Sequence, residues 1–294
     1  MAVTAALVKE LRERTGAGMM ECKKALTENG GDIEATIEAM RKSGQAKAAK
    51  KAGRIAADGV VVIRIADDGK RGVVLEVNSE TDFVAKDAGF QAFADGAAAQ
   101  ALASDVQDVA ELAQQPMPGT GGTVDQAREA LISKIGENVQ LRRLVRYEGV
   151  SGRLTSYRHG VRIGVVVEIE GGDEALGKDL AMHIAASNPH CVDASQVAPE
   201  ALEKEKDIFR AQALQSGKPE AIVDKMIDGR VRKYLEEVTL VGQPFVKDPE
   251  QTVEKLLKQA GAKVLRFSRI EVGEGLEKRD ENFADEVMAQ VRGA

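Results

Sequence analysis

Apolar residues recur every three or four positions in the N-terminal part of the chain, and this spacing predicts three short amphipathic helices. Gly16 and Gly18 end the first helix, because glycine tolerates the left-handed backbone of a helix terminus. Three helices of this size have a marginal core, so we expect a small docking module attached to a larger body. Met20 lies about 100° off the apolar face. The three apolar stripes are Val3, Leu7, Val8 and Leu11; Met19, Cys22 and Leu26; and Ile33, Ile37 and Met40.

Continuous apolar runs, which are typical of buried strands, occur at two places that repeat each other. Residues 72–77 read Gly-Val-Val-Leu-Glu-Val and residues 164–169 read Gly-Val-Val-Val-Glu-Ile, while Lys86-Asp87 returns as Lys178-Asp179 at the same spacing of 92 positions. Each run follows another apolar strand across a glycine-containing turn, and each leads into two helices and a closing strand. We therefore expect an α+β fold whose core is a duplicated α/β unit, ββααβ, with antiparallel sheets and helices on one sheet face.

The second unit is longer than the first. The closing strands begin near Val139 and Val264, which are 125 positions apart, so at least 33 residues (125 − 92) are inserted in the second unit. Residues 199–240 have helical apolar periodicity on both sides of a break at Ser216-Gly217-Lys218-Pro219. We expect two antiparallel helices that project on the order of 25 Å as an interaction arm.

Two further segments lie outside this plan. Residues 104–123, with Pro116, Pro118 and several glycines, predict an irregular connector between the helices of the first unit. Within residues 282–291, Phe283, Val287 and Val291 have helical spacing and predict a detached last helix. The apolar stripe of that helix must dock on this chain or on a partner.

An aromatic residue has an unusual place at the corner after residues 72–77. Thr81 or Asp82 can cap the helix that follows, and Phe83 comes next, where a chain usually has small polar residues. The position 92 residues later is Ala175, so the repeated fold does not require a phenylalanine here. Either Phe83 fills a differently shaped core, or it is a wedge presented to a partner beside the Asp82 carboxylate.

Composition narrows the class of protein. The chain has 294 residues and a net charge of -6, which argues against broad phosphate-backbone binding, and the absence of Trp leaves little surface for base stacking. Cys22 and Cys191 are far apart in the sequence, which indicates a reducing compartment. No apolar run has membrane-spanning length and no signal pattern precedes the first helix. We expect a cytoplasmic protein that contacts neither a membrane nor, directly, a nucleic acid.

A basic segment connects the predicted helical module to the core. Residues 42–54 contain no acid and five positive charges: Lys42, Lys47, Lys50, Lys51 and Arg54. Two interpretations stay open, a solvated helical linker or a contact strip for an acidic surface or RNA.

The chain shows no signature of bond-breaking chemistry. It has neither a Gly-x-x-x-x-Gly-Lys-Ser/Thr phosphate loop nor a Gly-x-Gly-x-x-Gly after a strand. His190 is next to Cys191, but nothing else there has zinc-ligand spacing, and His183 lies on an apolar helix where a satisfied core imidazole is expected. We predict no catalytic residue, no metal site and no cofactor, and hence a protein that is not an enzyme.

Several long motifs follow one another along the chain: Leu11–Met20, Cys22–Leu26, Glu80–Ala85, Ser156–Gly160, Gly217–Pro219, Gly242–Val246 and Gly273–Gly275. In their order and over nearly the whole chain they closely resemble bacterial elongation factor Ts. That family is the nucleotide-exchange factor for elongation factor Tu, the GTPase that delivers aminoacyl-tRNA to the ribosome. The resemblance implies an N-terminal three-helix module similar to a ubiquitin-associated (UBA) domain, a two-part core, a protruding helical hairpin and a C-terminal helical module.

With the repeat, this plan gives four parts. We expect residues 1–54 to form the UBA-like module and the basic linker, and residues 55–150 to form the N-terminal subdomain of the core. Residues 151–272 form its C-terminal subdomain, with the hairpin inserted at 199–240, and residues 273–294 form the C-terminal module. The resemblance associates the hairpin with homodimerisation.

The resemblance also implies roles for particular residues. The segment Thr81-Asp82-Phe83-Val84 enters the GTPase domain of elongation factor Tu and helps to dislodge Mg²⁺. Arg12, Met19 and Met20 dock on that domain, and His159 lies near its phosphate-loop side. The implied function is to bind elongation factor Tu, both with GDP and without nucleotide, and to promote GDP release during translation elongation without any bond chemistry.

Two functions of other classes remain hypotheses on the residues alone. A structural adaptor would use the helical module, the basic segment and the arm to bind several partners, and salt-dependent RNA binding would support it. A ligand-sensing enzyme built on the duplicated units would need a nucleophile or base, for which the sequence offers no candidate.

Overall fold

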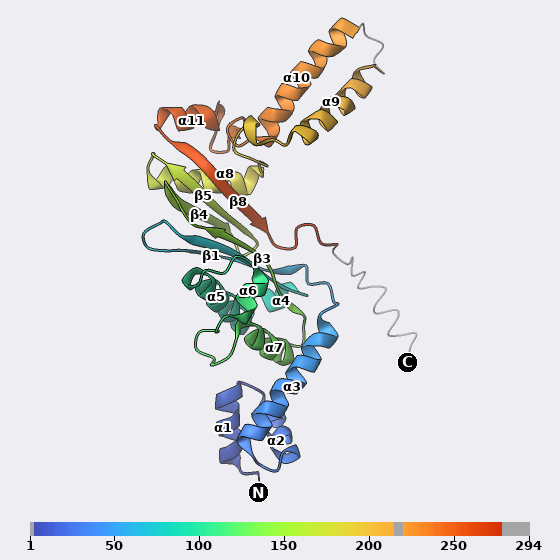
Figure 1. Cartoon of the computed structure of the whole chain (residues 1–294), viewed down its shortest axis with the longest axis vertical. Helices are drawn as coiled ribbons and strands as arrows, with labels where there is room; N and C mark the ends of the chain where they lie inside the picture. Colours follow the sequence, from blue (N-terminus) through green and yellow to red (C-terminus); the bar gives the residue numbers. More distant parts are fainter. Residues whose placement is uncertain (1–2, 215–219, 278–294) are drawn as a thin grey trace. The chain divides into compact units, whose positions relative to one another are not determined.

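The computed structural model describes residues 3–214 and 220–277, and its order of helices and strands is that of an α+β protein (Figure 1). The chain forms two compact units. The first unit comprises Met1–Val62, Leu75–Leu144 and Val272–Ala294, and the second comprises Ile63–Val74 and Val145–Glu271. None of the helices within the described ranges is long and apolar enough to cross a membrane.

Three helices open the first unit: α1 (Ala5–Thr15), α2 (Met19–Glu28) and α3 (Ile33–Lys51). Gly16 ends α1 with a φ of 68°, as predicted. The residues that form the buried core of this module all belong to the predicted stripes: Val8, Leu11, Cys22 and Leu26. Met19 is the exception, because it begins α2 before the turn that packs Cys22 into the core, and its side chain is 59% exposed.

The third helix is longer than the short helix predicted, because it continues through most of the basic segment to Lys51. Asp32 caps its N-terminus by accepting a hydrogen bond from the backbone N–H of Ala35. Its second half packs against α7 (Val124–Ile135), where the Cβ position of Gly44 faces Ser133. The basic segment is therefore helical as far as Lys51.

The first repeat has the predicted order of elements. Strands β1 (Asp58–Ile65), β2 (Gly72–Ser79) and β3 (Val139–Tyr147) form one sheet in the order β1-β2-β3. Between β2 and β3 lie α4 (Asp82–Ala85), α5 (Ala88–Ala103) and α7. Helix α5 buries two phenylalanines and a row of alanines that lets α7 pack against it: Phe90, Phe93, Ala94, Ala97, Ala98 and Ala101.

The prediction of an irregular connector over residues 104–123 is wrong in its first half. A short helix, α6 (Val109–Gln114), lies there; Asp108 caps it and Leu112 is fully buried. Residues 104–108 and the part with prolines and glycines are irregular, and the latter part is closed by a bridge between Pro116 and Thr123. The high Pro and Gly content concealed one apolar anchor and one helix cap, which suffice for a helix this short.

The second unit repeats the plan. Strands β4 (Arg153–His159), β5 (Ile163–Glu170) and β8 (Lys263–Glu271) form an antiparallel sheet in the order β4-β5-β8. Helices α8 (Glu174–Ser187) and α11 (Val253–Gln259) cover it with a core that includes Val165, Leu180 and Leu257. The two ββααβ units predicted from the repeat are thus present.

The insertion contains α9 (Pro199–Leu214) and α10 (Glu220–Val238), which run alongside each other (Figure 1). Their contact contains Ala213, Val223 and Ile227, with Phe209 and Val231 at its edge. A short 3-10 turn, η1 (Ala194–Gln196), precedes them, and a ribbon of β6 (Pro244–Phe245) and β7 (Asp248–Thr252), which we did not predict, follows. The predicted break at 216–219 and the predicted last helix at 282–291 lie outside the described residues.

Candidate partner-binding site

The corner between β2 and α5 contains a one-turn helix with a cap at each side. Thr81 is the N-cap of α4, and its hydroxyl accepts a hydrogen bond from the backbone N–H of Val84 at 3.4 Å. Asp87 caps α5 by accepting from the N–H of Phe90 at 2.9 Å. Of the two caps that the sequence allowed for this turn, the structure uses Thr81.

The side chains of α4 divide sharply between inside and outside. Phe83 is 80% exposed, whereas Val84 and Ala85 are only 7% and 4% exposed. The interpretation of Phe83 as a core residue is therefore wrong, because Val84 fills the core at this turn. A large exposed aromatic on a tightly anchored corner is typical of a surface that a partner covers.

Charge beside Phe83 is balanced in the free protein. The Lys86 ammonium lies 2.7 Å from the Asp82 carboxylate and 6.0 Å from the centre of the Phe83 ring. The hydrogen bond from Lys86 lowers the pKa of Asp82, so this carboxylate is ionised at neutral pH. An exposed ion pair of this kind exchanges easily with groups of a partner.

Two glutamates that were not predicted as site residues hold this corner. The Glu137 carboxylate accepts from the backbone N–H of Thr81 at 3.0 Å and from its hydroxyl at 2.8 Å. In the other direction, Glu80 accepts from the backbone N–H of Asn138 at 2.6 Å and pairs with Arg54 at 3.5 Å. Neither glutamate binds a neighbour in the sequence, because the backbone N–H groups that they accept from are 56 and 58 positions away in the chain.

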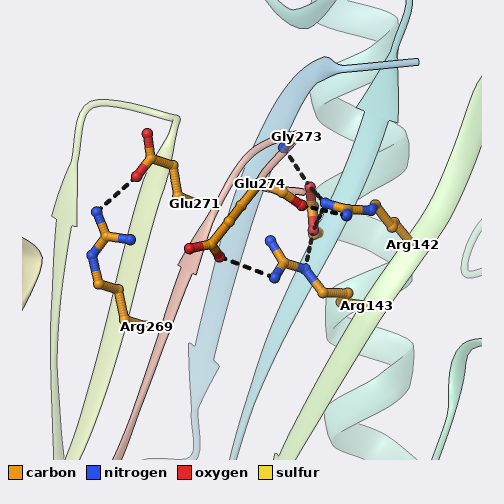
Figure 2. Close-up of polar contacts among 7 residues, drawn as sticks. Arg142, Arg143, Arg269, Glu271, Gly273 and Glu274 are labelled. Carbon is orange, nitrogen blue, oxygen red and sulfur yellow. Dashed lines mark hydrogen bonds and ion pairs between the residues drawn. The ribbon is translucent and has the colours of Figure 1, made fainter. Parts of the chain in front are cut away.

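The strand that leads to the corner is held by a buried carboxylate. Glu76 on β2 has no exposed surface and accepts from Arg142, Arg143 and the backbone N–H of Gly273. Figure 2 shows both guanidinium groups pointing into this cluster, with Glu274 beside Arg143. Burial opposes ionisation of Glu76, but the hydrogen bonds from Gly273, Arg143 and Arg142 outweigh it and lower its pKa.

The repeat contains a second buried carboxylate at the same position. Glu168 on β5, 92 residues after Glu76, accepts from Arg266 at 2.6 Å and from the backbone N–H of Ser151 at 3.0 Å. Because both copies have a glutamate of this kind, it belongs to the architecture of the repeated unit. It does not distinguish the corner that carries Phe83.

The predicted docking residues of the helical module lie on its surface. Arg12 on α1 is exposed, and Met19 and Met20 form the first turn of α2. Met20 is 75% exposed, so both methionines are among the most exposed large apolar residues of the described part of the chain. Flexible thioether side chains adapt to irregular apolar surfaces, so such a pair is suited to a protein partner.

The remaining predicted contact, His159, lies at the end of β4 in the second unit. Its imidazole is exposed, and Nδ1 lies 3.2 Å from the hydroxyl of Tyr157. Gly160 follows with a φ of 60° and begins the turn to β5. The side chain is thus accessible at the tip of a hairpin.

The histidine expected to be structural is part of the core. His183 is fully buried on α8; its Nδ1 accepts from the backbone N–H of Val246, so Nε2 carries the proton and donates to Gln243 Oε1 at 2.9 Å. Burial lowers the pKa of His183, although the hydrogen bond with Gln243 opposes the shift. In residues 3–214 and 220–277 no three His, Cys, Asp or Glu side chains gather as ligands for a metal ion.

The basic segment is largely engaged by the chain itself. Lys42 pairs with Glu38 at 2.7 Å on the same helix, and Lys47 reaches both Glu21 and Ser133. Lys51 donates to the backbone carbonyl of Gly136, and Arg54 pairs with Glu80. These contacts favour the interpretation of the segment as a helical linker over that of a contact strip for an acidic surface or RNA.

Comparison with known proteins agrees with the resemblance of the motifs. The family model described as Elongation factor TS matches residues 80–274, which include the Phe83 corner and all the strands and helices of the second repeat. The chain is 62% identical to "Elongation factor Ts" of Thioalkalivibrio sulfidiphilus over 295 residues, and 60% identical to that of Methylococcus capsulatus over 294 residues, with both chains fully covered in each case. A Legionella pneumophila relative of the same name is 55% identical over 290 residues, 99% of each chain.

Proposed function

The chain belongs to the elongation factor Ts family, and from this premise we propose that it is the guanine-nucleotide exchange factor of elongation factor Tu. Membership of the family implies a translation factor that accelerates GDP release and does not make or break bonds. The observation that supports the mechanism most directly is the exposed Phe83 on a rigid corner.

Phe83 acts as an apolar wedge. In the free protein its ring is mostly in water, so it gains burial when it enters a crevice of the partner, at about 25 cal/mol per Å² of apolar surface covered. Asp82 enters with it and can exchange Lys86 for a cation of the partner. The energy of burying Phe83 is thereby used to displace the elements that line the crevice.

The displaced elements are those that hold the metal and the phosphates. Mg²⁺ requires nearly octahedral oxygen geometry and bridges the nucleotide phosphates to a GTPase. A shift of the surrounding loops weakens the metal and the phosphates together. The wedge therefore accelerates the slow dissociation of GDP without any chemical reaction.

Other surfaces provide docking. Arg12, Met19 and Met20 bind the GTPase domain of the partner, which fits their exposure on the helical module, and His159 contacts its phosphate-loop side. The module at 1–54, the two subdomains at 55–150 and 151–272 and the C-terminal module at 273–294 are the working parts of this plan. The arm at 199–240 is the part suited to homodimerisation, and the protein acts in the cytoplasm.

Thermodynamic linkage provides the test. If the factor weakens GDP binding by a given ratio, GDP must weaken binding of the factor by the same ratio. Isothermal titration of this protein into elongation factor Tu, with and without GDP and Mg²⁺, should show much tighter binding to the nucleotide-free form. Equal affinity for the two forms would contradict an exchange function.

A further inference from the structure

We propose that Glu137 is a positioning residue for Phe83. Glu80, Thr81, Glu137 and Asn138 form a reciprocal clasp that holds the corner in its partner-binding geometry before any partner is present. The positioning itself is a property of the free protein, whereas its effect on GDP release rests on the proposed function.

The clasp consists of two Glu-x pairs, Glu80-Thr81 and Glu137-Asn138, in which the glutamate of each pair accepts a hydrogen bond from the backbone of the other pair. The backbone N–H of Thr81 donates to the Glu137 carboxylate at 3.0 Å, and the backbone N–H of Asn138 donates to the Glu80 carboxylate at 2.6 Å. The Thr81 hydroxyl adds a third hydrogen bond to Glu137 at 2.8 Å. Each glutamate thus fixes the backbone of the other's segment, and the charge of the acceptor strengthens these hydrogen bonds.

The corner needs such support because α4 has only four residues. A single turn is not stable by itself, since the cost of nucleating a helix exceeds the gain from so few hydrogen bonds. Val84 anchors the turn from the core side, and Glu137 anchors its N-cap, Thr81, from the other segment. Together they restrict the direction in which Phe83 points.

The second copy shows that the fold does not need the clasp. The residues that correspond to Glu80 and Thr81 at the spacing of 92 are Gly172 and Asp173, and the residue that corresponds to Glu137 at the spacing of 125 is Ala262. The same two segments meet there, because a Cβ on Gly172 would lie 3.2 Å from the Cβ of Ala262. That corner closes with small residues and caps its helix with Asp173 alone. The clasp is therefore present in the copy that has Phe83 and is not required by the repeated fold.

The segment that supplies Glu137 also holds the end of α3. Asn138 Nδ2 donates to the carbonyl of Arg54 at 2.7 Å, and Gln140 Nε2 donates to that of Ala52 at 3.3 Å. Lys51 donates to the carbonyl of Gly136. Residues 136–140 thus contact both the Phe83 corner and the C-terminal end of α3, a helix of the module that contains Met19 and Met20.

Amide hydrogen exchange of the free protein tests the positioning. In Glu137→Ala, the amides of Thr81 and Val84 should exchange at least about 10-fold faster than in the wild type, because a lost hydrogen bond to a charged acceptor changes a local equilibrium by about that factor or more. The matched control is Glu111→Ala, which removes a glutamate that accepts from the backbone N–H of Gln107 at 2.8 Å. This control should leave the corner protected, and unchanged protection of Thr81 in Glu137→Ala would overturn the proposal.

The effect on function is read from the dependence of GDP release on factor concentration. Glu137→Ala should lower the maximal release rate roughly 10-fold, in line with the loss of protection, while the half-saturating concentration changes less, because Met19 and Met20 still dock. Glu137→Gln keeps only one of the two oxygens that accept from Thr81, so its maximal rate and its protection of Thr81 should lie between those of the wild type and Glu137→Ala. If Glu137→Ala fails to fold, wild-type protection of Thr81 in Glu137→Gln would overturn the proposal. A normal maximal rate in an unprotected Glu137→Ala would refute the functional role. A wild-type protein that does not accelerate GDP release would refute the proposed function. The amide hydrogen exchange of the free protein would still decide whether Glu137 positions Phe83.

Discussion

Truncation of Phe83 should separate exchange activity from folding stability. Full burial of a phenylalanine side chain contributes about 1.5–3 kcal/mol, and 80% of this side chain is exposed in the free protein. A partner that covers the ring therefore gains roughly 1.2–2.4 kcal/mol from it. At about 1.4 kcal/mol per factor of ten, Phe83→Ala should lower the second-order rate constant of stimulated GDP release roughly 7- to 50-fold.

The same numbers predict a small effect on the fold. Only about a fifth of the ring is buried within the chain, so truncation should cost roughly 0.3–0.6 kcal/mol of unfolding free energy. That corresponds to a fall in Tm of about 1–2 °C for a protein of this size.

The assay is stopped-flow release of fluorescent GDP from elongation factor Tu, with thermal unfolding followed in parallel by circular dichroism. Val246→Ala, which truncates another exposed apolar side chain, is the control and should leave the rate unchanged. A Phe83→Ala protein that exchanges at the wild-type rate refutes the wedge. A large loss of stability would instead show that Phe83 is part of the core.

Two other properties should respond in predictable directions. Val84 is only 7% exposed, so Val84→Ala should lower the unfolding free energy by about 1.6 kcal/mol for two buried methyl groups, plus a cavity contribution. Urea titration measures this change. A stability within error of the wild type would contradict the role of Val84 as the anchor of α4. The pKa of His183 is lowered by burial, so the unfolded state binds a proton first as the pH falls below about 6.5. Stability should fall with pH from that value down to the folded-state pKa, by at most about 1.4 kcal/mol per pH unit, and thermal unfolding of His183→Gln should lack this component between pH 5 and 6.5.

The repeated pattern made most of the core predictable. A spacing of 92 positions predicted two sheets of the same order and the helices that follow their second strands, and the residues at 199–240 were recognisable as an insertion. Such predictions succeed because a strand or helix that buries one face must repeat apolar residues at its own period. The short helix α6 was missed because one buried leucine, Leu112, has no period.

The site was predictable only where a single residue departs from the repeat. Phe83 attracted attention because its counterpart is Ala175, but the sequence left its exposure undecided. Met19 has the spacing of a core residue and yet lies on the surface, because it begins α2 before the turn that packs Cys22 into the core. Glu137 gave no signal, since its role depends on the position of Thr81, 56 residues earlier in the chain.

One kinetic measurement shows whether this chain speeds the release of GDP from elongation factor Tu. Elongation factor Tu loaded with fluorescent GDP and Mg²⁺ is mixed with excess unlabelled GDP and increasing concentrations of the wild-type protein. The release rate should rise with the concentration of the protein and reach a plateau. A rate that stays at the value of elongation factor Tu alone, at every concentration of the protein, would contradict the account.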